Sequence, residues 1–306
     1  MKVAICGLII RYNDNVIKRN ALVRKNLDPD CKHDLILFHE GNISEAEQEQ
    51  RMSEIPKLKF IDISDRCFKL PDWIDPEGGN GKMNGPKYER IGYKHMCRFY
   101  SLQIFDYLDD YDYVMRLDDD GFIETPVGFD LFEHMEEQGA EFLYRILDWD
   151  THKPTLNRFP QIVHRYIEER GLTIPGSYDF IDVKLRTEQP AHTRHKWHSY
   201  TGPETWSKGI MGFSTKLHSI LGYYSNLYAS RLAFWRRPDV QDFLNYIDKD
   251  GCIYYWRVGD QPIHAAALQL FLDPDKIIRT NSFTYNHHSH YTIVPEGDEP
   301  EPGGMC

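Results

Sequence analysis

Hydrophobic and polar positions alternate between two patterns in the first 120 residues. Segments with apolar residues at helical spacing lie at 15–26 and 93–108, and the charged segment 45–54 predicts an exposed helix. Continuous apolar runs, typical of strands buried on both faces of a sheet, occupy residues 3–10, 34–39, 58–63 and 113–117. This order predicts an α/β fold with an open, mostly parallel central sheet flanked by helices.

The pattern is less regular after residue 120. Residues 172–208 are mixed and rich in loop-forming residues, and the four glycines of 76–86 also predict a loop. The last segment, 295–306, is too polar to bury a core, so we expect a disordered tail. Helices are expected over residues 127–138, 158–170, 238–248 and 260–270, and short strands over 142–146 and 209–214.

Composition limits the classes of partner. The chain has 36 Lys and Arg against 47 Asp and Glu, a net charge of −11, which disfavours nucleic acid because its binding needs a basic surface. No run of about 18 apolar residues occurs, so the sequence predicts no transmembrane helix. Residues 1–10 are apolar, but Arg11 follows instead of a cleavage site, which favours a first strand over a signal peptide.

Three consecutive carboxylates, Asp118, Asp119 and Asp120, follow the apolar run that ends at Leu117, and Gly121 comes next. Adjacent carboxylates at the end of a buried strand need partners, and a divalent cation such as Mg²⁺ or Mn²⁺ is the simplest one. The strand ends of open α/β sheets are also where such folds bind ligands. These residues predict a metal-dependent site for a phosphorylated ligand, and the alternative is a solvated, aspartate-rich turn.

Several short motifs keep a fixed order between about residues 70 and 290. They are Pro71-Asp-Trp-Ile-Asp75, Tyr93-Lys-His-Met-Cys-Arg-Phe99, Arg116-Leu-Asp-Asp-Asp120, Tyr246-Ile-Asp-Lys-Asp-Gly251, Tyr255-Trp-Arg-Val-Gly-Asp-Gln-Pro-Ile-His264, Leu270-Phe-Leu-Asp273 and Tyr285-Asn-His287. Through these motifs the chain resembles the fungal-type α-1,2-mannosyltransferases, glycosyltransferase family 15, whose version of the Asp-x-Asp motif reads Arg-Val-Glu-Pro-Asp. No single motif is specific, but together they are.

The resemblance implies a GT-A fold and a metal-dependent, retaining transfer of mannose from GDP-mannose to a glycan or glycoprotein acceptor. It also implies one domain over residues 1–294. Within that domain, residues 1–120 would form the nucleotide-binding half and residues 121–294 the acceptor and sugar half.

The resemblance also implies two groups of site residues. Asp120 and His287 would bind Mn²⁺ or Mg²⁺, with Asp118 nearby in place of a glutamate. An imidazole nitrogen suits Mn²⁺ better than Ca²⁺, although the polar sequence around His287 by itself favours an ordinary loop histidine. Arg11 would lie near the nucleotide, while Tyr93 and Asp260 would border the sugar site.

Other polar residues have two or more interpretations. Arg98, in the helix before the aspartates, would hold either a phosphate or a structural carboxylate, and its packed helix favours the second. Trp73 would stack on a sugar or fill the core. The histidines at three-residue spacing are candidates for a zinc site, an acceptor-facing wall or, as we favour, an exposed loop: His192, His195 and His198.

Tyr228 departs from the family pattern. The segment Ser225-Asn-Leu-Tyr228 aligns with Ser-Asn-Phe-Glu, whose glutamate is the candidate nucleophile or sugar ligand. A tyrosine is a far weaker nucleophile at neutral pH unless its pKa is strongly lowered. Two possibilities follow: transfer by departure and attack on one face of the sugar, or a role for another carboxylate such as Asp260 or Glu204.

Two other functions remain open at this point. Tyr228 is compatible with a non-catalytic module that binds nucleotide sugars or carbohydrates, and the aspartates are compatible with a phosphohydrolase that uses a second metal ion. Because Met1 leads directly into the first strand, we expect a soluble, cytoplasmic protein of viral or microbial origin. The Golgi lumen is the alternative if a membrane anchor has been removed.

Overall fold

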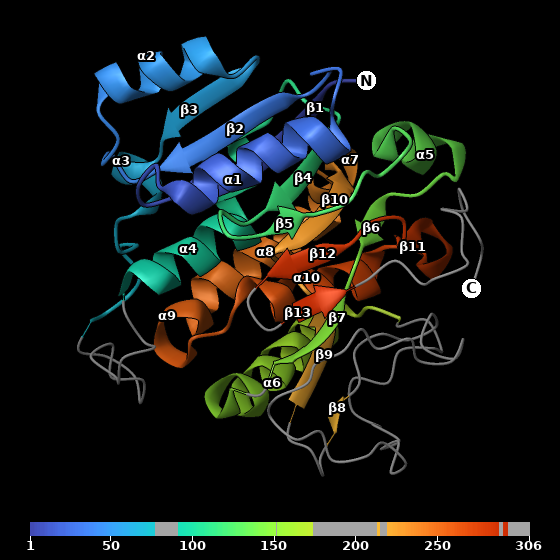
Figure 1. Cartoon of the computed structure of the whole chain (residues 1–306). Helices are drawn as coiled ribbons and strands as arrows, with labels where there is room; N and C mark the ends of the chain where they lie inside the picture. Colours follow the sequence, from blue (N-terminus) through green and yellow to red (C-terminus); the bar gives the residue numbers. More distant parts are fainter. Residues whose placement is uncertain (77–90, 151, 174–212, 215–218, 288–289, 293–306) are drawn as a thin grey trace.

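The protein is represented by a computed structural model, which describes residues 1–76, 91–150, 152–173, 213–214, 219–287 and 290–292 (Figure 1). The tail expected at 295–306, most of the loop at 76–86 and the three histidines of 192–198 therefore lie outside the described residues. None of the helices in the described part of the chain is long and apolar enough to span a bilayer. The expected cytoplasmic location stays a prediction.

A seven-stranded sheet runs through the centre of the molecule (Figure 1). Its strands, in spatial order, are β11 (Ile277–Arg279), β6 (Phe142–Tyr144), β10 (Leu227–Arg231), β4 (Tyr113–Leu117), β1 (Val3–Ile9), β2 (Asp34–His39) and β3 (Leu58–Asp62). All neighbouring pairs are parallel except the two that β10 makes with β4 and β6. The prediction of a mostly parallel sheet is confirmed, and strands from both halves of the chain share it.

Both faces of this sheet are covered by helices because its strands are apolar on both sides. Val3 and Ile5 of β1 pack on one face with α1 (Asp14–Leu22) and α5 (Leu131–Glu137). The opposite face carries Ala4 and Cys6. The helices packed there are α4 (Ile91–Ser101), α6 (Lys153–Arg170), α8 (Pro238–Asp250) and α10 (Asp260–Phe271).

Two small three-stranded sheets lie beside the central sheet. One contains β5 (Phe122–Ile123), β12 (Tyr285–His287) and β13 (His290–Thr292), and the other β7 (Leu147–Asp150), β9 (Ser219–Tyr223) and β8 (Phe213–Ser214). β5 directly follows the aspartates and pairs with β12 through Phe122 and Asn286. The remaining helical segments are α2 (Glu45–Glu54), α3 (Ser64–Cys67), α7 (Leu232–Trp235), α9 (Cys252–Trp256), a π turn (Val23–Leu27) and two 3-10 turns (Gln103–Tyr107 and Pro274–Lys276).

Local sequence explains where the helices begin and end. Asn13 caps α1 by accepting a hydrogen bond from the backbone nitrogen of Val16 over 3.1 Å. α8 begins with Pro238, and Gly251 ends it in the left-handed region at φ +78°. The charged helix expected at 45–54 forms α2 and has no buried residue. The helix expected at 93–108 is α4 followed by a 3-10 turn, and the one expected at 127–138 begins only at Leu131.

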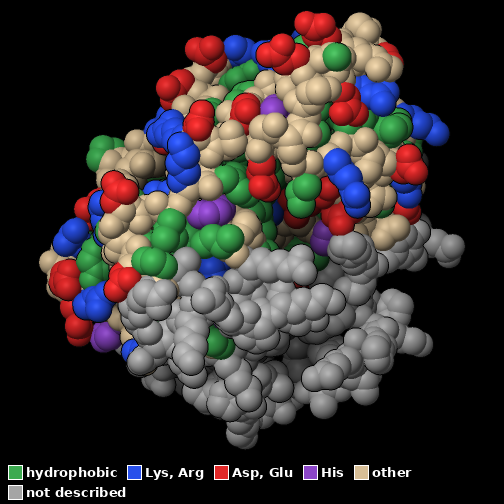
Figure 2. Space-filling view, turned by 90° about the vertical axis from the view of Figure 1, so that its left-hand side faces the viewer, with side chains coloured by type: hydrophobic (Ala, Val, Ile, Leu, Met, Phe, Trp, Pro, Cys, Tyr) green, Lys and Arg blue, Asp and Glu red, His purple; other side chains and the backbone are tan. Residues whose placement is uncertain are grey.

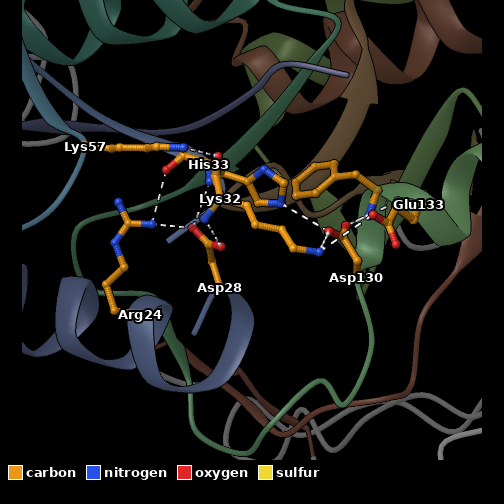
Figure 3. A network of polar contacts seen from close by, with 8 residues as sticks. Arg24, Asp28, Lys32, His33, Lys57, Asp130 and Glu133 are labelled. Atoms are coloured by element: carbon orange, nitrogen blue, oxygen red, sulfur yellow. Dashed lines mark hydrogen bonds and ion pairs between the residues drawn. The ribbon is translucent and has the colours of Figure 1, made fainter. Parts of the chain in front are cut away.

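A polar network fixes the connection between α1 and β2 against the start of α5 (Figure 3). The Asp28 carboxylate accepts hydrogen bonds from Arg24 and from the backbone nitrogens of Lys32 and His33, the latter two over 2.8 and 3.1 Å. Lys32 Nζ lies 3.3 Å from Asp130, which is the N-cap of α5. The network therefore joins two elements on the same face of the sheet and helps to hold that layer together.

Candidate active site

The three aspartates form a tight turn at the carboxyl end of β4, in the middle of the sheet. Gly121 N donates to the Asp118 carbonyl oxygen over 3.1 Å, and Asp118 N donates to the carbonyl oxygen of Asn226 over 3.0 Å. A Cβ atom on Gly121 would lie 2.8 Å from the hydroxyl oxygen of Tyr285, so only a glycine permits this approach to β12. The turn therefore holds the carboxylates against the strand that ends at His287.

Asp120 and His287 meet where the turn contacts β12. His287 Nε2 lies 2.9 Å from Asp120 Oδ1, and the two side chains are 12% and 21% exposed, respectively. On the other side of the ring, His287 Nδ1 lies 2.8 Å from the hydroxyl oxygen of Tyr224. This second contact orients the ring, and a proton on Nδ1 leaves the lone pair of Nε2 for a cation.

The chemistry of these two side chains fits a divalent cation such as Mn²⁺. They offer one carboxylate oxygen and one imidazole nitrogen, both of which Mn²⁺ accepts. Their 2.9 Å separation is close to the roughly 3 Å between neighbouring ligands around an octahedral ion with bonds of about 2.1 Å. Since no group of three or more acidic, histidine or cysteine side chains in the described residues is arranged to hold a metal, water and phosphate would supply the other ligands.

Arg116, a buried residue of β4, connects Asp118 with Asp260. Its Nε donates to Asp118 Oδ1 over 2.9 Å, and its Nη1 donates to Asp260 Oδ2. The guanidinium lies 3.5 Å from the centre of the Tyr100 ring. One positive charge is thus shared by two carboxylates, so Arg116, Asp118 and Asp260 together carry a net negative charge. Asp119 and Asp120 add to it.

Burial and mutual repulsion act on the triplet. Burial raises the pKa of Asp118, although Arg116 opposes the effect. Burial, together with the neighbouring Asp120 and Asp118, raises the pKa of Asp119 to about 6. Three adjacent acids are therefore poorly compensated by the protein alone, and a bound cation would relieve their repulsion.

Asp260 differs from the triplet because it is strongly held in its ionised form. Burial works against its charge, but Arg116, His264 and Ser225 outweigh burial, and the pKa of Asp260 lies below its ordinary value. The residue is also the first of α10, where the helix dipole favours a negative charge. A carboxylate so engaged is a good anchor and a poor nucleophile.

An open pocket of about 740 Å³ is lined by His287 and by the cluster of Arg116, Asp118 and Asp260. This volume is ample for a bound sugar and diphosphate. Four carboxylates and two positively charged arginines contribute to its wall. The lining residues are Tyr93, Met96, Arg116, Asp118, Asp148, Asp150, His152, Pro154, Tyr224, Ser225, Asn226, Arg257, Gly259, Asp260, Gln261, Pro262 and His287. On the face that Figure 2 presents, acidic and basic side chains are interspersed without one continuous basic surface.

The structure brings most of the expected site residues together. Asp118, Asp260 and His287 line the pocket, and Asp120 contacts His287 at its edge. Tyr93 also lines it, with the guanidinium of Arg257 4.6 Å from its ring centre.

Three of the expected residues that the structure describes, Arg11, Arg98 and Tyr228, do not line the pocket. Arg11 is exposed just after β1 and is absent from the pocket lining within the described residues. Arg98 donates from Nε and Nη2 to Asp248 over 2.7 and 2.9 Å, which is the structural carboxylate of the favoured interpretation. Glu204 falls outside the described residues.

Tyr228 lies in β10 and is 1% exposed. Its ring stacks on Phe142 with centres 5.4 Å apart, and it is absent from the pocket lining within the described residues. Burial raises the pKa of the Tyr228 hydroxyl above its ordinary value, so the phenolate needed for attack is disfavoured.

Sequence reasoning gave no role to several pocket residues. Asp148 and Asp150 come from β7, and their alternation with apolar neighbours was the only available signal. Arg257 ends α9 in the left-handed region at φ +55°, a conformation that is costly for arginine. Tyr224 and Asn226 stand in a segment for which no element was predicted, and their spacing is not distinctive.

Several known mannosyltransferases are similar to this chain in sequence. The model of the family described as glycolipid 2-alpha-mannosyltransferase matches residues 30–299. Glycolipid 2-alpha-mannosyltransferase 2 of Candida albicans is 28% identical over 78% of this chain and 47% of its own length. Alpha-1,2 mannosyltransferase KTR1 of Saccharomyces cerevisiae is 24% identical over 75% of this chain and 53% of its own length. The chain thus spans about half the length of these relatives.

Solved structures of high similarity confirm the predicted GT-A fold. Core-mannan synthase A of Aspergillus fumigatus, in an Mn/GDP form, has a TM-score of 0.75 at 20% identity, over 98% of this chain and 79% of that one. The mannosyltransferase Ktr4p of S. cerevisiae in complex with GDP has a TM-score of 0.76 at 20% identity, over 98% and 74%. With the match over residues 30–299, these findings show that the chain belongs to glycosyltransferase family 15.

Proposed function

We propose that this protein is a metal-dependent, retaining glycosyltransferase that moves mannose from GDP-mannose to a glycan acceptor. The observation that carries the proposal is the Asp120–His287 pair at the edge of a pocket that also contains Arg116 and Asp260. The names of the relatives support mannose as the sugar, and the titles of the solved structures support Mn²⁺ and GDP as ligands.

The division of labour within the site follows from charge. When bound, Mn²⁺ would neutralise the charge that develops on the diphosphate leaving group. Asp120 and His287 would hold it, and Tyr224 would keep the imidazole in position. Arg116 holds Asp118 and Asp260 in place, and Tyr93 borders the sugar.

We infer that no covalent intermediate forms on Tyr228. Its hydroxyl is buried and does not line the pocket among the described residues, and Asp260 is held by Arg116 in a form that disfavours nucleophilic attack. Departure of the diphosphate and attack by the acceptor on one face of the sugar therefore fit the pocket best. Glu204 remains untested as an alternative carboxylate because it lies outside the described residues.

Calorimetric titration of GDP with and without Mn²⁺ tests the metal-binding part of the proposal. GDP should bind the wild-type protein only with Mn²⁺, and Asp120→Ala should weaken that binding by about 100-fold or more, since it removes a charged metal ligand. Asp65→Ala is a matched surface control, because the Asp65 side chain is fully exposed. A GDP affinity that changes neither with Mn²⁺ nor with Asp120→Ala would refute the proposal.

Tyr228 also favours a second candidate, a module that binds nucleotide sugars without turning them over. A hydrolysis assay with GDP-mannose separates the two. Mn²⁺-dependent release of mannose would eliminate the binding module, whereas tight binding with no hydrolysis or transfer would favour it.

A further inference from the structure

Asn226 carries a buried amide in the pocket wall that none of the described residues hydrogen-bonds. The residue is 4% exposed and lines the pocket. Neither its Oδ1 nor its Nδ2 has a hydrogen-bond partner among the described residues. A buried amide without partners is costly, and such groups are rare enough in native proteins to call for an explanation.

The backbone around Asn226 is firmly placed. Its carbonyl oxygen accepts from Asp118 N over 3.0 Å, which ties it to the triplet. Tyr224, two residues earlier, contacts His287, and Ser225 hydrogen-bonds Asp260. This turn therefore contacts both His287 and Asp260, and Asn226 is the next residue along it and lines the same pocket.

A second amide in the same wall shows the contrast. Gln261 also lines the pocket, but its Nε2 donates to the carbonyl oxygen of Asp148 over 3.0 Å. The protein thus uses the donor of Gln261 to join α10 to β7. Among the described residues the amide of Asn226 has no such task, so it is available to a ligand in the pocket.

We propose that the amide of Asn226 hydrogen-bonds hydroxyl groups of the donor sugar and so helps to select it, an inference that rests on the proposed function. The amide has a donor and an acceptor to satisfy. A phosphate at neutral pH offers acceptors and would leave Oδ1 unpaired, whereas a pair of sugar hydroxyls both accepts and donates. The edge of a guanine base has the same complement, and the experiment separates these sources.

The variant Asn226→Leu, of similar size but without polar atoms, is the decisive change. In the ligand-free protein it should leave the melting temperature unchanged or raise it, because it removes an unsatisfied amide. Affinity for GDP with Mn²⁺ should stay within about 3-fold, while affinity for GDP-mannose without acceptor should fall by about 10- to 100-fold. Asn226→Asp loses the amide donor and keeps an acceptor, so its affinity for GDP-mannose should lie between those of the wild type and the leucine variant.

Asn20→Leu is a matched control for a structural amide. Asn20 is 1% exposed, accepts from Arg19 over 2.8 Å and donates to the Tyr12 hydroxyl over 3.3 Å. Its replacement should lower the melting temperature, since both partners would lose their hydrogen bonds. If Asn226→Leu lowers the melting temperature to the same degree, Asn226 is structural and the inference is overturned.

The two nucleotides provide the remaining outcomes. Equal losses for GDP and GDP-mannose would assign the amide to the base or the diphosphate and overturn the sugar contact. Unchanged affinity for GDP-mannose would overturn it too. In both cases metal-dependent binding by the wild type would leave the proposed function standing, whereas a wild type that binds neither nucleotide would refute both.

Discussion

Two buried arginines show how the same kind of ion pair can serve different purposes. Arg98 in α4 places two nitrogens on the carboxylate of Asp248 in α8, one charge against one. Arg116 in β4 divides its guanidinium between Asp118 and Asp260, one charge against two. The first pair is electrically balanced and the second carries surplus negative charge.

The surroundings of the two arginines differ in the same sense. Trp73 covers the first pair: its Nε1 donates to the Asp248 carbonyl oxygen over 2.9 Å, and its ring lies 5.3 Å from the Arg98 guanidinium. The second pair opens onto the pocket that His287, one of the two proposed metal ligands, also lines. A balanced, covered pair fixes two helices together, whereas an unbalanced pair at a pocket is prepared for a positively charged partner.

Arg116→Met should have the largest effect, because it leaves the buried Asp260 and the half-buried Asp118 without their shared partner. The free energy of unfolding should fall by about 3–5 kcal/mol, and transfer activity per folded molecule by about 100-fold or more. Urea unfolding and initial rates measure the two losses. The double change Arg116→Met with Asp260→Asn should recover part of the stability and none of the activity, and recovery of activity would contradict the assigned role.

Arg98→Met should cost a similar free energy of unfolding, about 3–5 kcal/mol, through the unpaired Asp248. Turnover per folded molecule should change by less than about 3-fold, since this pair does not reach the pocket. Adding Asp248→Leu should return most of the stability, because removing both partners of a buried pair is often nearly neutral. A specific loss of GDP affinity in Arg98→Met would mean instead that Arg98 contacts the nucleotide.

The parallel strands β1, β2, β3 and β4 were predictable from sequence because each is a mainly apolar run, whereas the short parallel strand β11 was not predicted. β10 escaped prediction although it lies between β4 and β6 in the middle of the sheet. Its Ser230 is fully buried, but the hydroxyl donates to the carbonyl oxygen of Glu141 over 3.1 Å and accepts from Trp235 over 2.8 Å. Contacts that satisfy a buried serine are made by the tertiary structure, and no local pattern of polarity reveals them.

The site was only partly predictable for a related reason. The three aspartates were predictable because they directly follow an apolar run. His287 was identified only through family resemblance, since its neighbours are those of an ordinary loop. The contact with Asp120 depends on the pairing of β5 with β12, two strands far apart in the chain. Asn226 lies in the segment that aligns with the family's Ser-Asn-Phe-Glu, but its distinguishing property, the absence of a partner among the described residues, is visible only in the structure.

Tyr228→Phe should have the smallest effect. It tests whether Tyr228 acts as the nucleophile. The Tyr228 ring packs between Phe142 and His264, and its hydroxyl has no partner among the described residues. Removing only the hydroxyl should therefore change transfer rates by less than about 3-fold and the free energy of unfolding by less than about 1 kcal/mol.

Tyr228→Ala is the companion change to Tyr228→Phe, because it removes the packed ring as well. It should cost about 3–5 kcal/mol of unfolding free energy through the cavity it leaves. A covalent role predicts a different pattern: Tyr228→Phe would retain stability yet lose nearly all activity, and a glycosyl-tyrosine would be detectable by mass spectrometry. Retained activity in Tyr228→Phe therefore separates a packing tyrosine from a nucleophile.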